Sequence, residues 1–396
     1  MNILFYCNEY PPVATGGIGS VTKIIAENLV SQGHKVIVIG YYVNSPVGVT
    51  KDCINGVDVY RLNGGYRSKM LTYLPCSVAF YLRLFSSTAQ KELRYLEDFI
   101  QEKINSEKID VIELTDYNRI NWESYPALNF RKFNVPCVLR IHGSVSFLDK
   151  LSGKKRPWAV KNDLNHFSRC DYIAAVSKFS LDYINENFDM PSIDYKNRIV
   201  IYNPIEDKFL KNADREKEEK RILFIGKLSE TKGCYSLLKA FNKISDKYPD
   251  WKLVMIGRGD VAVAQKYLLP DVAERVEFLG YLSREEIQQQ IDISAFACVP
   301  SYFENFSMVA LEIMAREKAL IYTERTSGVE IIDDGKNGLL VDPENIDSIA
   351  DKIEILINDH DYRKKLSVAA YKTILENFTV SIILQKLLSF YASIAK

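Results

Sequence analysis

The sequence lacks the segments that place a chain in or across a membrane. No run of uncharged apolar residues reaches the about 18 that a transmembrane helix needs. The first residues, MNILFYCNEYPP, have neither the basic start nor the long apolar core of a secretory signal peptide. We therefore expect a cytoplasmic protein.

Patterns for metal binding and nucleophilic catalysis are also missing. The seven cysteines form no C-x-x-C pair, and no His, Cys and Asp cluster has metal-ligand spacing. The only Asp-x-Asp is DHD at 359–361, where an aspartate that caps the next helix is the simpler explanation. The Walker pattern and the G-x-S-x-G elbow are absent. The sequence therefore predicts reduced thiols and no bound metal, and it argues against a P-loop NTPase or a serine hydrolase.

The composition is that of a large soluble globular protein. The chain has 396 residues, 47% of them hydrophobic and 26% charged, with a net charge of zero. At ~150 residues per domain this length suggests two or three domains, of which we expect two. From Arg119 to Lys178 the chain carries 11 basic and 4 acidic residues, including KKR at 154–156. The basic part around 150–161 has two interpretations. It binds acidic lipid or a phosphate-bearing acceptor, or it is an ordinary solvated loop.

Short apolar runs alternate with helical segments along the whole chain. The first series is NILFYC, KVIVIGYY, VDVYRL, IDVIEL, VPCVLRIH, DYIAAVS and NRIVIYN, and the second is ILFIGKL, WKLVMIG, RVEFLG, ISAFACVP, ALIYT and NGLLVDP. A charge-dense segment near 204–220 separates them. Continuous apolar strands alternating with helices are typical of parallel sheets covered on both faces. The sequence thus predicts two α/β domains and a final amphipathic helix that could pack on either.

Ligands of open α/β sheets bind beyond the carboxyl ends of the strands, so two facing sheets would place a site in the cleft between them. The residues that follow strands are Gly16, Gly17, Asp116, His142, Ser177, Lys227, Gly257 and Glu304. His142 ends a strand and precedes a glycine, which leaves a catalytic and a structural role equally reasonable.

Two lysines, Lys227 and Lys232, follow one strand and precede a helix that begins near Gly233. Cations beside the free N–H groups of a helix start suit a diphosphate, although surface lysines are often only solvated. Gly16 and Gly17 precede another helix, where a glycine lets the backbone approach an anion. An ordinary flexible loop explains that pair of glycines equally well.

The stretch VPSYFENFSMVALEIMA, residues 299–315, holds two carboxylates in an apolar run. A helix starting near Ser307 would leave Glu304 in the loop and place Glu312 among apolar neighbours, where an unpaired carboxylate is costly. One explanation is an ion pair with Arg316, four residues later. The other is that Glu312 accepts hydrogen bonds from two ligand hydroxyls, as an acidic side chain does with a ribose diol.

Taken in order, several segments resemble the retaining glycosyltransferase family 4, of GT-B fold, over essentially the whole chain. They are EYPPVATGGIGSV, NLVSQGHKVIV, VLRIHGS, AAVSKFS, IYNPI, ILFIGKLSETKG, LVMIGRGD, VEFLGYLS, PSYFENFSMVALEIMA and GKNGLLVDP. The resemblance implies two Rossmann-like domains facing across a cleft. It assigns residues 1–203 and the C-terminal helix 379–396 to the acceptor-side domain, and 204–378 to the nucleotide-sugar-binding domain.

The resemblance also implies which residues hold the nucleotide of the donor. Glu312 would bind the ribose hydroxyls. Lys232 would bind the diphosphate together with Lys227, which stands where the family usually has arginine and so lacks the bidentate fork. Gly17 would let the N-terminal loop close over the diphosphate.

For the donor sugar, the resemblance implies contacts from Glu304, from His142, and from the backbone amides of Phe306, Ser307 and Met308. The expected catalytic residues are Glu304, His142 and Lys232. Two departures affect this region. Ser307 replaces a common glycine, so that its side chain would crowd the sugar, and Gly328 lies one residue closer to Glu330 than the family pattern places it.

The expected activity is hexosyl transfer from a nucleotide-diphosphate sugar to a hydroxyl of a glycan or lipid-linked acceptor, with uracil as the expected base. Lysines and a helix N-terminus would stabilise the departing diphosphate, so no metal or other cofactor is expected. The resemblance implies same-face attack with retention. The alternatives are a GT-B nucleotide-sugar epimerase and a catalytically silent nucleotide-sugar-binding partner of an active transferase.

The remaining expectations concern partners. We expect no nucleic acid. The segment KMLTYLPCSVAFYLRLF, residues 69–85, is either a membrane-facing or acceptor-facing helix or an ordinary core helix. A peripheral contact with the inner face of the membrane is therefore an alternative to a wholly cytoplasmic location.

Overall fold

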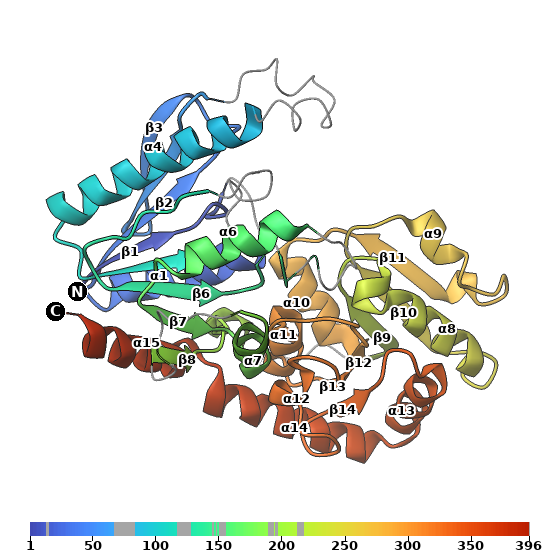
Figure 1. Cartoon of the computed structure of the whole chain (residues 1–396). Coiled ribbons are helices and arrows are strands. Elements are labelled where there is room, and N and C mark those ends of the chain that lie inside the picture. Colours follow the sequence, from blue (N-terminus) through green and yellow to red (C-terminus); the bar gives the residue numbers. More distant parts are fainter. Residues whose placement is uncertain are drawn as a thin grey trace. The chain divides into compact units, whose positions relative to one another are not determined.

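A computed structural model describes residues 1–12, 16–66, 84–116, 128–144, 146–147, 149, 156–188, 194, 197–211 and 218–395. The chain divides into two compact units (Figure 1). Unit 1 is Met1–Pro204 with Ile383–Lys396, and unit 2 is Ile205–Ile382. The boundaries that the family resemblance implies, after residue 203 and at residue 379, lie one and four residues from these positions.

Unit 1 is built on an eight-stranded sheet of order β3-β4-β2-β1-β5-β6-β7-β8. All neighbouring strands are parallel except β3 and β4, which are antiparallel. The strands are β1 Asn2–Tyr6, β2 Lys35–Tyr41, β3 Gly48–Ile54, β4 Val57–Asn63, β5 Val111–Thr115, β6 Cys137–Ile141, β7 Tyr172–Ala175 and β8 Arg198–Val200. The helices are α1 Gly17–Ser31, α4 Leu84–Ser106, α6 Pro157–Phe167, α7 Lys178–Asn187 and, from Ile383 onward, the C-terminal helix α15 Val380–Ile394.

The central strands of unit 1 are buried on both faces. Leu4 of β1 packs in one hydrophobic core with Leu96 of α4, while the alternate residues Ile3 and Phe5 are buried as well. Because successive strand side chains point to opposite faces, both faces of the sheet are covered. This double burial explains why these strands read as continuous apolar runs.

The sequence does not predict β3. This strand, GVTKDCI, pairs only with β4 at the edge of the sheet, and most of its residues are exposed or half-buried. An edge strand wetted on both faces carries no apolar run or clean alternation, so no hydrophobic pattern marks it.

The C-terminal part of α15 is tied to unit 1 by a buried polar chain. The hydroxyl of Tyr391 donates to Glu113 Oε2 at 2.6 Å, and the guanidinium of Arg140 donates to Glu113 Oε1 at 3.2 Å. Arg140 also donates to the carbonyl of Ile201 at 3.0 Å. One carboxylate on β5 thus links the last helix to β6, and through Arg140 to the segment after β8.

Unit 2 contains a six-stranded, wholly parallel sheet of order β11-β10-β9-β12-β13-β14. Its strands are β9 Glu219–Ile225, β10 Lys252–Ile256, β11 Val276–Gly280, β12 Ser294–Val299, β13 Ala319–Thr323 and β14 Leu339–Val341. Its helices are α8 Cys234–Ile244, α9 Val261–Gln265, α10 Arg284–Ile293, α11 Met308–Ala315, α12 Gly328–Ile331, α13 Ile346–Asn358 and α14 His360–Asn377. Short 3-10 turns are η3 Asp207–Phe209, η4 Glu230–Lys232 and η5 Ala273–Arg275.

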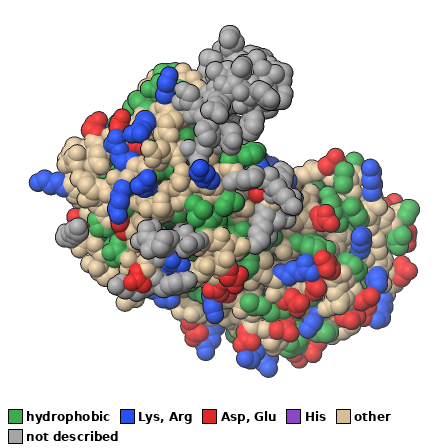
Figure 2. Space-filling view, in the orientation of Figure 1, with side chains coloured by type: hydrophobic (Ala, Val, Ile, Leu, Met, Phe, Trp, Pro, Cys, Tyr) green, Lys and Arg blue, Asp and Glu red, His purple; other side chains and the backbone are tan. Residues whose placement is uncertain are grey.

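Ion pairs connect neighbouring helices of unit 2. Lys247, in the turn after α8, binds Glu354 of α13 at 2.7 Å, and Lys243 of α8 pairs with Asp347 of α13. In Figure 2, acidic and basic side chains are interspersed over the part of the surface that unit 2 forms. The predicted cap in DHD is confirmed, because the Asp359 side chain accepts from the backbone N–H of Tyr362 at 2.8 Å.

The connecting segment at the start of unit 2 is held by three consecutive buried residues directly after α11. Arg316 donates to the carbonyl of Leu210 at 2.9 Å, Glu317 pairs with Lys211, and Lys318 binds Glu218 at 2.9 Å. Lys211 and Glu218, on either side of residues 212–217, are therefore fixed against the body of unit 2.

The two segments considered for membrane contact fall mostly outside the described residues, which omit 67–83 and 150–155. Arg156, the last residue of the KKR run, donates to Asp149 Oδ2 at 2.6 Å. In the described part of the chain, no helix combines the length and apolar character needed to cross a membrane.

Candidate functional site

Glu304 lies in the loop after β12, where its side chain contacts the turn η4 that follows the neighbouring strand β9. Lys232, in η4 after β9, places its Nζ 2.8 Å from Glu304 Oε1, and the hydroxyl of Ser301 donates to the same oxygen at 3.0 Å. The second oxygen, Oε2, accepts no hydrogen bond from the residues that the structure describes. The fold therefore brings together two predicted site residues that are 72 positions apart.

The backbone of Glu304 is hydrogen-bonded to the loop that follows a third strand, β13. Its N–H donates to Thr326 Oγ1 at 3.1 Å, and its carbonyl accepts from the hydroxyl of Ser327 at 3.1 Å. Both hydroxyls belong to the loop after β13. Loops from three consecutive strands of the sheet, β9, β12 and β13, thus fix this one residue.

A close backbone approach keeps Lys232 next to this loop. Gly233, which precedes α8, has a φ of +70°, and a Cβ at that position would lie 1.8 Å from the carbonyl oxygen of Pro300. The N–H of Tyr302 donates to the carbonyl of Thr231 at 2.9 Å. Only glycine lets the two loops pack this tightly.

Helix α11 starts at the same edge of the sheet. Ser307 caps it, since its hydroxyl accepts from the N–H of Ala310 at 3.3 Å, and Ser307 is only 4% exposed. The first N–H groups of a helix have no partner inside it, so the start of α11, with the backbone of Ser307 and Met308, can receive an anion. Phe306, just before the cap, is buried beside Phe378. The predicted crowding of a donor sugar by Ser307 stays a prediction.

Glu312, on the second turn of α11, is a buried carboxylate without a hydrogen bond to the described part of the chain. Burial raises its pKa to about 7, although the charge of Arg284 lowers it, and Glu206 adds a further increase. Arg284 is itself engaged, because its Nη1 donates to Glu206 Oε2 at 2.7 Å. The carboxylate is therefore poorly compensated by protein groups, and its predicted role in binding ligand hydroxyls stays a prediction.

The alternative explanation for Glu312, an ion pair with Arg316, is wrong. Arg316 donates from Nε to Asp292 Oδ1 at 2.8 Å and from Nη2 to Asp292 Oδ2 at 2.5 Å. Helix α11 ends at Ala315, and Arg316 follows it with φ −88° and ψ 12°. The N–H of Arg316 still donates to the Glu312 carbonyl at 3.3 Å, so the ion pair is absent because Asp292 and the Leu210 carbonyl bind the guanidinium.

Lys227 is exposed in the loop between β9 and η4, and it forms no ion pair within the described residues. The backbone around it is ordered by the next strand, as the N–H of Leu228 donates to the carbonyl of Arg258 at 2.8 Å. Its ammonium is therefore available to a ligand at the carboxyl end of β9.

Two predicted residues belong to unit 1. His142 follows β6, where Asp116 accepts from the backbone N–H groups of His142 at 2.9 Å and of Gly143 at 2.8 Å. Burial, and then the charge of Arg140, lower the pKa of His142 to about 3, so that the ring is neutral at physiological pH. Gly17 begins α1, and a Cβ there would meet nothing within 4 Å in the described residues.

Three residues of the site were not found from the sequence: Ser301, Thr326 and Ser327. Their contacts to Glu304 depend on the meeting of strand ends, which spacing along the chain does not reveal. The only signal was the unusual position of Gly328 in TSGVEII, which marked this loop as different without showing what it touches.

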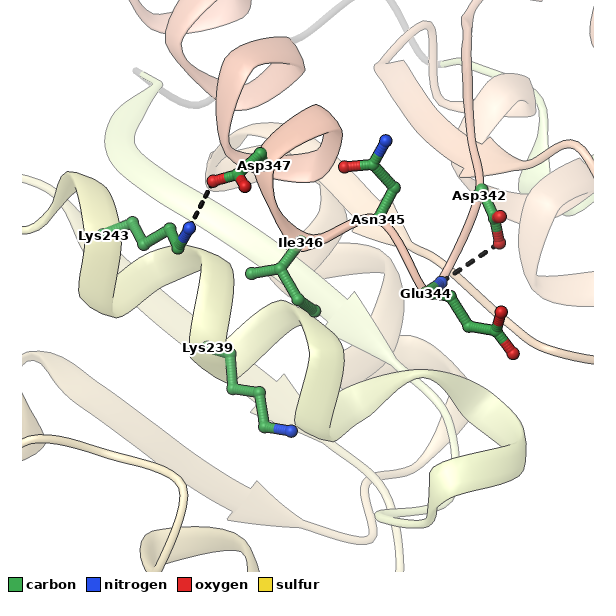
Figure 3. Close-up of a pocket in the computed structure, with 7 residues that line it drawn as sticks. All are labelled: Lys239, Lys243, Asp342, Glu344, Asn345, Ile346 and Asp347. Carbon is green, nitrogen blue, oxygen red and sulfur yellow. Dashed lines mark hydrogen bonds and ion pairs between the residues drawn. The ribbon is translucent and has the colours of Figure 1, made fainter.

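A separate shallow pocket of about 690 Å³ lies between α8 and the start of α13 (Figure 3). Most of its charged side chains are paired: Lys243 pairs with Asp347, and Arg325, outside the pocket lining, binds Asp342 at 2.7 Å and Glu344 at 3.1 Å. The pocket is lined by Lys239, Lys243, Asp342, Glu344, Asn345, Ile346 and Asp347. None of the predicted site residues is among them.

Comparisons with known proteins agree with this architecture. The model of Glycosyltransferase Family 4 matches residues 15–209, and that of Glycosyl transferases group 1 matches residues 206–373. HepE of Anabaena, solved in complex with UDP-glucose, has a TM-score of 0.66 at 17% identity, covering 99% of this chain and 100% of that one.

Two uncharacterized glycosyltransferases of Methanocaldococcus jannaschii are similar in sequence. One is 28% identical over 397 residues, which cover 96% of this chain and 95% of the relative. The other is 33% identical over 266 residues, which cover 66% of this chain and 70% of the relative. Together these findings show that the chain belongs to glycosyltransferase family 4 and is a glycosyltransferase of GT-B fold.

Proposed function

We propose that unit 2 binds a nucleotide-diphosphate sugar and that the enzyme transfers its sugar to a hydroxyl group. The observation that carries this proposal is the meeting of Lys232 and Glu304 beside the start of α11. An ammonium and free helix N–H groups suit a diphosphate, while a carboxylate with one free oxygen suits sugar hydroxyls. Lys227 adds a second ammonium at the same strand end.

Glu312 is proposed to bind the ribose of the nucleotide. A buried carboxylate with a raised pKa gains most from two hydroxyl donors, which stabilise its ionised form. Since Arg316 is committed to Asp292, no ion pair with Arg316 competes for this role. The pairing of Arg284 with Glu206 leaves its charge near Glu312 without satisfying the Glu312 oxygens.

The proposed donor is a UDP-hexose. The full-length match to HepE, whose structure holds UDP-glucose, supports this choice of base and sugar class. The proposed acceptor is a glycan or lipid-linked hydroxyl. The roles that the resemblance implies for Gly17 and His142, the exclusion of nucleic acid and the contact with a membrane surface stay predictions.

The proposed reaction needs no metal. The bond between the sugar C1 and the diphosphate oxygen breaks, and Lys232, Lys227 and the start of α11 stabilise the charge that develops on the departing oxygen. The acceptor oxygen forms the new bond to C1 on the same face, and its proton passes to the departing phosphate. The sugar therefore keeps its anomeric configuration.

A panel of nucleotide sugars tests this proposal. The purified protein is incubated with UDP-, GDP- and ADP-hexoses in buffer containing EDTA, and the release of nucleoside diphosphate is followed. We expect slow hydrolysis of at least one UDP-hexose, unaffected by EDTA, and faster release when a hydroxyl acceptor is added. Turnover of a GDP- or ADP-hexose alone would refute the proposed base, and activity only with a divalent cation would refute the metal-free reaction.

A further inference from the structure

Thr326 has a backbone conformation that its side chain disfavours. Its φ is +56°, in the left-handed region where branched side chains are rare. The other non-glycine residues with positive φ in the described ranges are Asn55, Lys108 and Glu317, none of which is branched at Cβ. Strain of this kind persists only where the surroundings impose it, and it concentrates at functional sites.

The contacts around Thr326 show what imposes this conformation. The loop folds back tightly after β13, since a Cβ at Gly328 would lie 1.9 Å from the carbonyl oxygen of Thr323. The N–H of Arg325 donates to Thr323 Oγ1 at 3.0 Å. In this turn two adjacent hydroxyls bind the backbone of Glu304. Thr326 Oγ1 accepts from the N–H of Glu304, and the Ser327 hydroxyl donates to its carbonyl, each at 3.1 Å.

Because the N–H and the carbonyl of Glu304 are both hydrogen-bonded, the position of its Cα and the direction of its Cα–Cβ bond are fixed. Lys232 and Ser301 then hold Oε1, so Oε2 is the oxygen left to meet a ligand. We propose that Thr326 and Ser327 are positioning residues that set the direction of the Glu304 carboxylate toward the donor sugar. This inference rests on the proposed function, because the contact between Glu304 and the sugar is part of that proposal.

A positioning role and a merely structural role predict different results for Thr326→Gly. Glycine adopts a positive φ without strain, so this variant should be as stable as the wild type or more so, even though the hydroxyl is lost. A purely structural residue would leave turnover unchanged once stability is preserved. A positioning residue lowers turnover, because a displaced catalytic group costs rate without costing stability.

The experiment compares Thr326→Gly, Thr326→Ser and Ser327→Ala with the wild type. UDP release from a panel of UDP-hexoses gives kcat and KM, calorimetry gives the UDP affinity, and thermal unfolding gives stability. We expect Thr326→Gly and Ser327→Ala to lower kcat by about tenfold, with the UDP affinity within about twofold of the wild type. Thr326→Ser keeps the hydroxyl and should retain most of the turnover.

Two controls separate the possible failures. Lys108→Gly, at an exposed positive-φ position in unit 1, relieves similar strain far from Glu304 in sequence and should leave kcat unchanged. Glu304→Gln should lower turnover if the proposed function is right. Impaired Glu304→Gln beside fully active Thr326→Gly and Ser327→Ala would overturn this inference alone. Unimpaired Glu304→Gln, or no turnover of any UDP-hexose by the wild type, would overturn the proposed function as well.

Discussion

Lys232 Nζ lies 2.8 Å from Glu304 Oε1, so the cation proposed for the diphosphate is paired with the carboxylate proposed for the sugar. The two side chains are 33% and 12% exposed. A diphosphate that binds Lys232 must compete with Glu304 for the ammonium. The pair thus couples the two halves of the proposed donor site.

Glu304→Gln should separate nucleotide binding from turnover. Glutamine keeps the shape but not the charge, so Lys232 becomes freer to bind phosphate. For a partly exposed pair the gain is small, and we expect UDP to bind about twofold to fivefold more tightly. Sugar transfer should fall at least tenfold, measured as UDP release from a UDP-hexose. Weaker UDP binding by this variant would show that the pair does not compete with the diphosphate.

Glu312 predicts a pH dependence of nucleotide binding. Its pKa is raised to about 7, so it is largely protonated at pH 6 and largely ionised at pH 8. Ribose hydroxyls stabilise the ionised form, which means that UDP should bind more tightly as the pH rises through 7, by up to about tenfold. Calorimetry at pH 6, 7 and 8 measures this. The UDP phosphates titrate in the same way when UDP binds Glu312→Gln, so this variant is the control. Its UDP affinity should lack the additional increase between pH 6 and pH 8 that ionisation of Glu312 causes.

Arg316 should contribute to stability and not to nucleotide binding. Its guanidinium bonds to Asp292 and to the Leu210 carbonyl, and removing it leaves both without these donors. We expect Arg316→Ala to lower the free energy of unfolding by about 2 kcal/mol, because a hydrogen-bonded charge pair and a carbonyl contact are lost together. Denaturant unfolding tests the stability. A substantial loss of UDP affinity in the folded variant would revive the pairing with Glu312.

Tyr391→Phe should loosen the C-terminal helix from unit 1. The substitution removes the donor at 2.6 Å from buried Glu113, whose other oxygen remains bound to Arg140. We expect a loss of about 1–3 kcal/mol in the free energy of unfolding, with faster amide hydrogen exchange along α15. Tyr172→Phe is the matched control. Tyr172, on β7, contacts the same helix through the ring of Phe390, so this variant also removes a tyrosine hydroxyl near α15. Equal effects of the two variants would argue against a special role for the Glu113 bond.

The sequence predicted the fold well where burial repeats along the chain. Runs such as those of β1 and β12 are apolar because both faces of a parallel sheet are covered, and this pattern is visible without coordinates. Strand β3 was missed because it is a polar edge strand. The bond from Tyr391 to Glu113 spans 278 positions, and no local pattern encodes such a contact.

For the candidate site, the sequence identified individual residues better than their partners. Glu304 and Glu312 were chosen as carboxylates in an apolar run and Lys232 for its place between a strand and a helix start, and the family resemblance implied a donor-site role for all three. The predicted pairing of Glu312 with Arg316 was wrong because helical spacing does not reveal that Asp292, on another helix, binds the same guanidinium. Thr326 was invisible, since its role comes from a backbone conformation that only the folded turn displays.

The most direct test of the account is calorimetric titration of UDP into the wild type and three variants. Lys232→Ala and Glu312→Ala remove the proposed contacts to the diphosphate and the ribose, while Lys243→Ala removes a lysine of the pocket in Figure 3. We predict that the first two variants bind UDP at least about tenfold more weakly, and that Lys243→Ala binds it like the wild type. If folded Lys232→Ala and Glu312→Ala bind UDP as tightly as the wild type, the proposed donor site is wrong.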